Sequence, residues 1–297
     1  MTLQQLRCLQ AVIASQLSIS RAADALHTTQ PAVSKLIRSL ENEIGVELFV
    51  RRGNRLVGLT DAGQEAQALS RRVLNDTRAL AGLAGAGQAG GSGTLRVGTT
   101  HIHARYGLPD VIRRFSKAHP AVNLELLQGH PAQIVQWVSD NAVDLGISTL
   151  PDNTPEGIVA LPAYPIPRCL IVPRRHPLLK LARVSVEDIA RYPLVTYDEH
   201  FNSGWMVTRE FQRRGLSPRV VVRATDANVI KAYVAAGLGV AVVQQMAVEP
   251  RRDTDLAVID TGELFPPSMA SVSLREDQYV RGYMQDFIDM IAAGGRR

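Results

Sequence analysis

The sequence predicts an α/β protein in two parts, a mostly helical N-terminal head with one β-hairpin and a larger domain of alternating strands and helices. Up to residue 83 apolar residues recur mainly at helical spacing, whereas beyond residue 93 short apolar runs alternate with amphipathic segments. The glycine-rich stretch 85–93 separates the two patterns and predicts a linker, because glycine loses much conformational freedom on ordering. A chain of 297 residues has room for two or three domains.

Composition and charge limit the classes of protein to which the chain can belong. Hydrophobic residues make up 45% and charged residues 21%, which is ordinary for a soluble globular protein. The formal net charge is +5, and residues 1–93 hold ten Lys or Arg against seven Asp or Glu. In 94–297 the corresponding numbers are 23 and 21, so the excess positive charge is concentrated in the first third and favours an anionic partner there.

The two cysteines, Cys8 and Cys169, lie far apart and have no spacing typical of a disulfide framework or a zinc site. We expect both to be small core residues in a reducing, cytoplasmic compartment. The N-terminus lacks the continuous apolar core of a signal peptide, and no later run is long enough to cross a membrane. These observations predict a cytoplasmic protein without a membrane partner.

Residues 18–40, SISRAADALHTTQPAVSKLIRSL, predict two short helices joined by a tight turn. Ser20 can cap the first helix, and Thr28 and Thr29 offer hydroxyls to the free N–H groups of the second. Pro31 fits the opening turn of this second helix, where a missing N–H has no cost. Gly45 is expected to end it.

The second helix has two distinct faces, one apolar and one polar. Amides and cations pair with base edges, and hydroxyls and cations pair with phosphates, so the polar face suits a DNA major groove. An ordinary amphipathic helix with a solvated face fits the periodicity equally well. The apolar positions, which are expected to be buried, are Val33, Leu36, Ile37, Leu40 and Ile44, and the polar face carries Gln30, Ser34, Lys35 and Arg38.

A basic hairpin follows and decides between these two interpretations. Residues 46–50 and 56–60 are strand-like and flank Arg51-Arg52-Gly53-Asn54-Arg55, in which the Gly-Asn pair predicts a tight turn. Three arginines around such a turn form a wing that would grip the phosphate backbone or the minor groove. A wing beside a helix with a polar face favours DNA binding by the head.

One further helix precedes this region and one follows it. Thr60 is expected to cap a long helix from Asp61 to about Leu83, whose apolar stripe needs a partner. Either a second subunit supplies that partner or the helix packs on its own domain. The stripe comprises Ala62, Ala66, Leu69, Val73, Leu80 and Leu83, and the first helix is expected to pack with Leu3, Leu6, Leu9, Val12 and Ile13.

Residues 1–65 resemble the winged helix-turn-helix of LysR-type transcriptional regulators. The resemblance implies a DNA-binding regulator, with the long helix pairing two subunits into a dimer that assembles into a homotetramer. The other implied partners are double-stranded promoter DNA, a small anionic effector and RNA polymerase. The resemblance rests on Leu6-Arg7-Cys8-Leu9, Ser20-Arg21-Ala22-Ala23, Thr29-Gln30-Pro31-Ala32-Val33-Ser34, Leu40-Glu41, Gly45-Val46-Glu47-Leu48-Phe49 and Leu59-Thr60-Asp61-Ala62-Gly63. The implied DNA-binding residues are Ser20, Thr29, Gln30, Pro31, Ser34, Lys35 and Arg38, with Arg51, Arg52 and Arg55 on the wing.

Beyond the linker the pattern predicts two α/β units with mostly parallel strands. The first unit carries strands 95–98, 122–127 and 145–148, with helices through 108–115 and 132–138. The second carries strands 169–172, 194–197, 219–223 and 240–243, with helices 186–190, 204–214 and 227–236. A strand near 256–259, the segment Phe265-Pro266-Pro267 and a final helix around 283–291 are expected to return the chain to the first unit.

Two lobes crossed twice by the chain resemble the periplasmic-binding-protein-like effector domain of LysR-type regulators, which implies a ligand in the cleft between the lobes. The predicted organisation is a winged helix-turn-helix domain at 1–60, a linker helix with a glycine-rich hinge at 61–93 and an effector-binding domain at 94–297. Within the last domain, lobe I is 94–163 with 267–297, and lobe II is 164–266.

Three junctions share one chemistry, in which a strand ends, small polar residues follow and a helix begins. They are Thr99-Thr100-His101, Asn202-Ser203-Gly204 and Thr225-Asp226-Ala227. Free N–H groups and hydroxyls at helix N-termini attract anions, so together the junctions could hold a small oxyanion. Each junction taken singly is also explained by helix capping. Asp226 would repel an anion unless it points away or binds an amine.

Several segments of the effector domain resemble the CysB and Cbl branch of the family, which regulates sulfur assimilation. The resemblance implies sulfate or an acetylated serine derivative as effector, and Thr100 matches an effector-binding residue of the branch. Ile102-His103 and Asn202 depart from the pattern and point to a different oxyanion, such as a sulfonate, a sulfate ester or an organic acid. The matching segments are Thr99-Thr100-His101, Ala104-Arg105-Tyr106, Leu108-Pro109, Gln128-Gly129, 193–197, 225–227, Val229-Ile230-Lys231, Tyr233, 237–240 and 283–288.

The expected effector pocket combines these junctions with residues from the ends of other strands. No cofactor is expected, and the candidate effectors are sulfate, O-acetylserine, adenosine phosphosulfate and a sulfonate. His101 and His103 lack an accompanying cysteine or paired acid, so a metal site with His130 or His200 is not expected, although either histidine could donate to an anion. The candidate effector residues are Thr99, Thr100, His101, Ile102, His103, Gln128, Ser148, Thr149, Asn202, Ser203, Thr225 and Asp226.

Other functions stay open as alternatives. An enzyme is disfavoured because the sequence has no Walker loop, nucleophile elbow, HExxH motif or glycine fingerprint after a strand. A soluble anion-binding module would share the cleft but has no use for the N-terminal head. A LysR-type regulator of another pathway would sense a different small organic acid.

Overall fold

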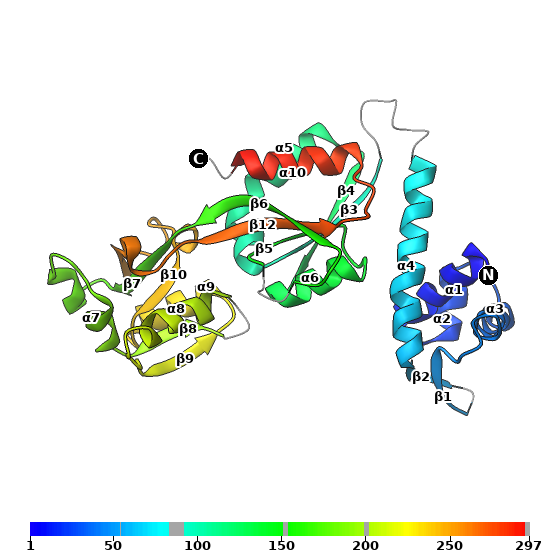
Figure 1. Cartoon of the computed structure of the whole chain (residues 1–297), viewed down its shortest axis with the longest axis horizontal. Coiled ribbons are helices and arrows are strands. Elements are labelled where there is room, and N and C mark those ends of the chain that lie inside the picture. The colour runs from blue at the N-terminus through cyan, green and yellow to red at the C-terminus, as the bar shows by residue number, and fades with distance from the viewer. Residues whose placement is uncertain (54, 83–91, 151–153, 199–201, 295–297) are drawn as a thin grey trace. The chain divides into compact units, whose positions relative to one another are not determined.

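The computed structural model describes residues 1–53, 55–82, 92–150, 154–198 and 202–294. Contacts divide the chain into two compact units, one built on residues 1–91 and the other on residues 92–139 and 143–297 (Figure 1). Asn54, Leu83 and most of the predicted glycine-rich hinge lie outside the described residues, so the hinge stays a prediction. No helix in the described part of the chain is long and apolar enough to span a bilayer.

The first unit is the predicted head, in which helices enclose one core beside a two-stranded antiparallel hairpin. Leu9, Val12, Val33 and Ile37 are at most 1% exposed and meet in this core, which α4 extends with Leu74. The elements are α1 (Leu3–Ala14), α2 (Ile19–Ala25), α3 (Gln30–Ile44), β1 (Phe49–Arg52), β2 (Arg55–Leu59) and α4 (Asp61–Gly82).

Burial in the head follows the predicted pattern with two exceptions. Leu3 and Ile44 are 39% and 43% exposed, because they lie at the outer ends of their helices, beyond the core. Cys8 is buried against Val33, as predicted for a small core residue, and burial raises the pKa of its thiol to about 11. Helical spacing therefore predicts the core well in the middle of each helix and poorly at the ends.

The helix caps correct two predictions. Ser18, not Ser20, caps α2 by accepting a hydrogen bond from the Arg21 amide at 3.3 Å, and Ser20 lies inside the helix. Thr29 occupies the N-cap position of α3 but its side chain makes no capping bond. Two other predictions are confirmed: Gly45 ends α3 with a φ of 84°, and the Thr60 hydroxyl accepts from the Gly63 amide at the start of α4.

Lobe I of the second unit is a five-stranded sheet in the order β4-β3-β5-β12-β6, with α5 and α10 on one face and α6 on the other (Figure 1). Phe115 of α5 and Phe287 of α10 pack edge to face in its core, with ring centroids 5.0 Å apart. The elements are β3 (Gly93–Thr99), the π-helical turn η2 (His103–Gly107), α5 (Pro109–Ala118), β4 (Val122–Gln128), α6 (Pro131–Ser139), β5 (Leu145–Ser148), β6 (Ile158–Ile166), β12 (Ser268–Arg275) and α10 (Gly282–Gly294).

Strands β6 and β12 were not predicted, and they pair with each other along eight residues of β12. Pro162 and Pro165 disfavour a strand prediction for this segment. However, β6 is an edge strand, where a missing N–H can face away from the sheet. Because β12 is antiparallel to both β5 and β6, the sheet is mixed and not mostly parallel as predicted.

Lobe II is built around a sheet in the order β10-β7-β11, to which the parallel pair β8-β9 is joined by a bridge from Leu194 to Val240. Side chains of β7 alternate between two cores, with Leu170 and Val172 on one face and Cys169 and Ile171 on the other. The elements are β7 (Arg168–Pro173), η3 (Pro177–Lys180), α7 (Val186–Ala190), β8 (Leu194–Tyr197), α8 (Asn202–Gln212), β9 (Val220–Ala224), α9 (Ala227–Ala235), β10 (Ala241–Gln244), η4 (Gln245–Ala247), β11 (Leu256–Asp260) and η5 (Gly262–Leu264).

The chain crosses between the lobes after β6 and again before β12. Two predictions differ for 256–259: β11 pairs with β7, so the predicted return to the first unit at this strand is wrong, whereas the predicted lobe II range of 164–266 includes it correctly. Arg168 joins the two crossings, since its guanidinium donates to the Pro266 carbonyl and to the Ser268 hydroxyl. Its side chain is 5% exposed, and burial lowers its pKa.

Candidate functional site

The head presents one exposed polar face on α3. Val33 and Ile37 are buried beneath it, while the side chains of Gln30, Lys35 and Arg38 are exposed. Side chains of this outer face surround a shallow groove lined by Pro31, Ser34, Lys35, Arg38, Ser39, Asn42 and Glu43. The predicted polar face is thus confirmed as solvent-facing.

Ser20 and Gln30 meet at the start of that face. The Gln30 amide donates to the Ser20 hydroxyl at 2.9 Å, and both residues are exposed. This contact fixes the orientation of the Gln30 side chain and leaves its amide oxygen without a described partner. A side-chain amide held in this way can pair with a base edge.

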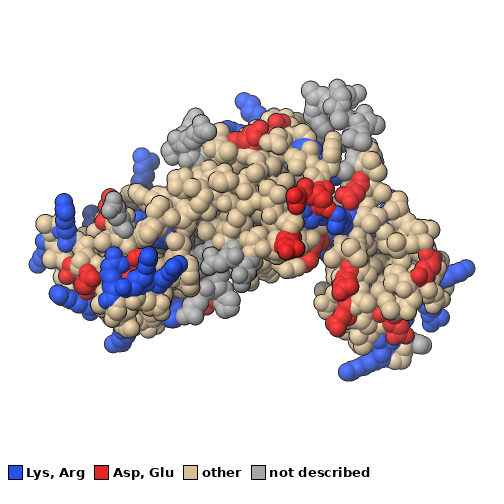
Figure 2. Space-filling view, in the orientation of Figure 1, with Lys and Arg blue, Asp and Glu red and all other residues tan. Residues whose placement is uncertain are grey.

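The three wing arginines differ from one another. Arg51 is held by the Glu41 carboxylate at 2.6 Å, whereas Arg52 and Arg55 are exposed. Arg55 also shares a second groove with Gln30, Pro31 and Ser34, so the wing and the start of α3 face one space. Figure 2 shows basic side chains projecting from the end of the head that carries the hairpin. Arg52 and Arg55 are therefore available to phosphates, and Arg51 has a structural contact instead.

The second candidate site is a cavity of about 40 Å³ in the second unit. That is room for about three water molecules or one small oxyanion. Lobe I lines it with Thr100, His101, Ile102, His103, Tyr106, Pro131, Thr149 and Ile166, and lobe II with Tyr197, Thr225, Asp226, Ala227 and Gln244.

Thr100 has a hydroxyl that the protein leaves unsatisfied. Its Oγ1 is buried and has no hydrogen-bond partner among the residues that the structure describes, although Thr100 lines the cavity. The register of β3 and β5 pairs Thr99 with Ile147, so the backbone of Thr100 follows beside Ser148, whose Oγ is also buried and has no partner within the described part of the chain. A buried hydroxyl without a partner costs about 1–3 kcal/mol, which a bound hydrogen-bonding ligand would relieve.

His101 and His103 lie in different environments. His101 is exposed at the cavity, while His103 is 1% exposed and its Nδ1 lies 2.7 Å from the Tyr164 hydroxyl. Burial lowers the pKa of His103 to about 4, so this imidazole is neutral at physiological pH. It can accept or donate one hydrogen bond in the site without carrying charge.

Asp226 lines the cavity and caps α9. Its Oδ1 accepts from the amides of Asn228 at 2.7 Å and Val229 at 3.4 Å. The carboxylate thus faces the N-terminus of its own helix, whose partial positive charge offsets it. The predicted repulsion between the Asp226 carboxylate and a bound anion is therefore partly reduced.

The remaining predicted residues divide into three groups. Thr225 and Thr149 line the cavity, as does Ile102, which also packs on a core cluster of lobe II. Thr99 and Gln128 do not line the cavity. The Thr99 hydroxyl donates to the Ile147 carbonyl inside the sheet, and Gln128 is exposed at the end of β4. The side chains of Asn202 and Ser203, and His200, lie outside the described residues.

Six lining residues were not predicted as effector residues: Tyr106, Pro131, Ile166, Tyr197, Ala227 and Gln244. Tyr197 and Gln244 end β8 and β10, and the Tyr197 hydroxyl donates to Gln244 Oε1 at 2.5 Å. Their position at the ends of apolar runs was the available signal, because ligands of α/β proteins bind where strands end. Within the described residues no cluster of three or more His, Cys, Asp or Glu is arranged to hold a metal.

Comparison with known proteins identifies the family. The model for "Bacterial regulatory helix-turn-helix protein, lysR family" matches residues 3–64, and the model for "LysR substrate binding domain" matches residues 88–296. The HTH-type transcriptional regulator SsuR of Burkholderia cenocepacia is 41% identical over 98% of this chain and 95% of its own length. CysB of the same organism is 38% identical over 98% of this chain and 93% of its own length.

A solved structure agrees with these sequence matches. The crystal structure of the cofactor-binding domain of the Cbl transcriptional regulator superposes with a TM-score of 0.65 at 35% identity, over 68% of this chain and 89% of that one. The family models together span the head and the two-lobed domain, as does each relative. The chain therefore belongs to the LysR family and is a DNA-binding transcriptional regulator, not an enzyme.

Proposed function

We propose that this regulator controls genes of sulfur assimilation or of organosulfur use, and that it senses a small oxyanion in the cavity between lobes I and II. The resemblance to the CysB and Cbl branch and the similarity to SsuR support the pathway. The unsatisfied Thr100 hydroxyl is the observation on which the ligand site depends.

The chemistry of the lining supports an oxyanion of small size. Sulfate has acceptor oxygens on every side and a small sulfonate has three at one end, and these match the Thr100 hydroxyl and the His101 imidazole that line the cavity. A cavity of about 40 Å³ is far smaller than adenosine phosphosulfate, which would need the lobes to open. Sulfate and short sulfonates are therefore the first candidates, with O-acetylserine next.

Calorimetry on the full chain tests the ligand site. Sulfate, thiosulfate, O-acetylserine, adenosine phosphosulfate and alkyl sulfonates are titrated in turn. We expect Thr100→Val to weaken binding of the preferred anion at least fivefold, on the scale of one hydrogen bond. Thr99→Val is the matched control, since the Thr99 hydroxyl is bonded inside the sheet and should not contact the ligand. Equal affinity in the wild type and Thr100→Val would show that the site lies elsewhere.

For DNA we propose that the start of α3 enters a major groove while the wing contacts the backbone. Gln30, Ser34, Lys35 and Arg38 would approach bases and phosphates, and Arg52 and Arg55 would contact phosphates. Retention on promoter DNA that Arg38→Ala abolishes, in a chain that still folds, tests the assignment. If Arg38→Ala leaves specific retention intact, the reading face has been placed wrongly.

We also propose a homodimer through α4, a tetramer of two such dimers, a cytoplasmic location and contact with RNA polymerase. The exposed apolar side chains of α4 support the dimer, because Leu69, Val73 and Leu80 are 61%, 40% and 67% exposed. Sedimentation of the purified chain tests the oligomer. Preferred binding of a sulfur-free organic acid would instead favour a regulator of another pathway.

A further inference from the structure

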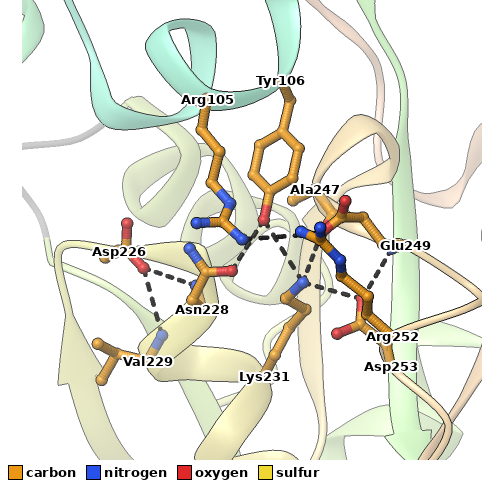
Figure 3. A network of polar contacts seen from close by, with 10 residues as sticks. All are labelled: Arg105, Tyr106, Asp226, Asn228, Val229, Lys231, Ala247, Glu249, Arg252 and Asp253. Atoms are coloured by element: carbon orange, nitrogen blue, oxygen red, sulfur yellow. Dashed lines mark hydrogen bonds and ion pairs between the residues drawn. The ribbon is translucent and has the colours of Figure 1, made fainter.

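A network of polar contacts joins lobe I to lobe II beside the cavity (Figure 3). Tyr106 projects from the π-helical turn η2 of lobe I, and its hydroxyl donates to Asn228 Oδ1 of α9 at 2.8 Å. Lys231 Nζ, one turn further along α9, lies 3.5 Å from the same hydroxyl and can donate to it. One phenol oxygen of lobe I thus contacts two side chains of lobe II.

Further hydrogen bonds within lobe II hold the Lys231 side chain in place. Its side chain is 6% exposed, and Nζ donates to the Ala247 carbonyl and to Asp253 Oδ2, both at 2.8 Å. Asp253 in turn accepts from the Glu249 amide at 2.7 Å. The ammonium group is therefore held in place, and the Tyr106 ring lies 5.7 Å from it, within the range of a cation–π contact.

The same contacts reach the cavity through one short segment of α9. Asp226, which lines the cavity, accepts from the backbone amide of Asn228, whose side chain accepts from Tyr106. Tyr106 lines the cavity too, and it packs against a core cluster of lobe II. The position of the lobe II wall of the cavity is thus set in part from lobe I.

We propose that Tyr106 is a positioning residue, which holds the N-terminus of α9 in its ligand-binding position through Asn228. The proposal rests on the proposed oxyanion site. As a consequence, ligand binding is coupled to the arrangement of the lobes. A ligand that contacts Asp226 or Ala227 contacts the same segment of α9 that Tyr106 connects to lobe I through its hydrogen bond to Asn228. For a ligand to close two lobes, some contact between the lobes must differ in free energy between the open and the closed state.

Calorimetric titration of the full chain with sulfate tests the coupling. Tyr106→Phe keeps the ring over Lys231 and removes only the hydroxyl, so we expect sulfate affinity to fall by about 3- to 10-fold, the scale of one hydrogen bond. Asn228→Ala should give a similar loss, and the double variant should lose no more than either single one. Tyr233→Phe, on the exposed side of the same helix, is the matched control and should bind as the wild type does. Additive losses, or unchanged affinity in Tyr106→Phe, would overturn the proposal.

Hydrogen exchange without ligand separates this proposal from the oxyanion site. In Tyr106→Phe we expect faster exchange of the amides at 226–231, with no change in α10, which packs on the far side of lobe I. Unchanged exchange at 226–231 would refute the positioning role even if sulfate binds. If wild-type protein binds no oxyanion but exchange at 226–231 still responds, the proposed effector is wrong and the positioning role stands.

Discussion

The Glu41 carboxylate lies 2.6 Å from the Arg51 guanidinium and also accepts hydrogen bonds from the amides of Leu48 and Phe49, at 3.0 and 3.3 Å. Glu41 is 8% exposed and joins the last turns of α3 to the first strand of the wing. One acidic side chain therefore orients the wing relative to α3. The same contact distinguishes Arg51 from its exposed neighbours.

Removing this carboxylate should destabilise the head. Glu41→Ala leaves two backbone N–H groups and one guanidinium without their acceptor in a largely buried position, which costs about 2–4 kcal/mol. Urea denaturation of the full chain measures the loss. Glu47→Ala, at an exposed site on the adjoining loop, serves as control and should change the free energy of unfolding by less than about 0.5 kcal/mol. Similar effects of the two changes would contradict the bridging role of Glu41.

The wing arginines should differ in the salt dependence of DNA binding. Each phosphate contact contributes about 0.9 to the slope of log affinity against log salt concentration. We therefore expect Arg52→Ala and Arg55→Ala each to lower the slope by roughly that amount, measured by fluorescence anisotropy on a short duplex of unrelated sequence. Arg51→Ala should leave the slope nearly unchanged, because Glu41 already neutralises that guanidinium. A larger change in Arg51→Ala than in the other two would show that Arg51 leaves Glu41 to bind DNA.

Much of the fold could be predicted from the sequence because local signals were strong. Helix α7 and strands β5 and β8 have the predicted bounds, and the helical period located α3 together with its two faces. The failures share one physical cause. Both β6, which contains two prolines, and β11, which belongs to lobe II, are placed by their neighbouring strands. Which strands become neighbours is decided by contacts between residues that are distant in the sequence.

The sites divide in the same way. Thr100 could be found because a strand end, a hydroxyl and a helix start are consecutive in the sequence. Tyr106 could not, since it reaches the cavity only when two lobes are brought together, and for Tyr197 and Gln244 the sequence offered only their position at the ends of apolar runs. Likewise, nothing local separates Arg51 from Arg52, because the acceptor that differs between them, Glu41, is ten residues from Arg51 along the chain.

Stability should depend on pH through His103. Its pKa is lowered to about 4 by burial, whereas an unfolded chain has the ordinary value near 6.5. Between these values the unfolded state binds a proton that the folded state does not, so the stabilisation present above pH 6.5 is lost as pH falls toward 4. The expected slope is up to about 1.4 kcal/mol per pH unit.

The measurement is the free energy of unfolding by urea at pH 5, 6 and 7 in the wild type and two variants. His103→Gln keeps a hydrogen-bonding group beside Tyr164 without a titrating ring, so its profile should be flatter by that slope. His101→Gln, at the exposed neighbour, should reproduce the wild-type profile. Identical profiles for all three proteins would contradict a lowered pKa of His103 in the folded state, because only a difference in pKa between the folded and unfolded states makes stability depend on pH.

The two sides of α4 should respond differently to substitution. Leu74 is 5% exposed and packs in the core of the head, so Leu74→Ala should cost about 2–5 kcal/mol of stability without changing the oligomer once folded. Leu69 is 61% exposed, so Leu69→Glu should leave the unfolding of the head almost unchanged. If α4 pairs two subunits, Leu69→Glu places a charge in an apolar interface and should lower the sedimentation coefficient toward that of the monomer. A wild-type sedimentation profile in Leu69→Glu would exclude this side of α4 from the interface, because an unpaired carboxylate is not tolerated between packed helices.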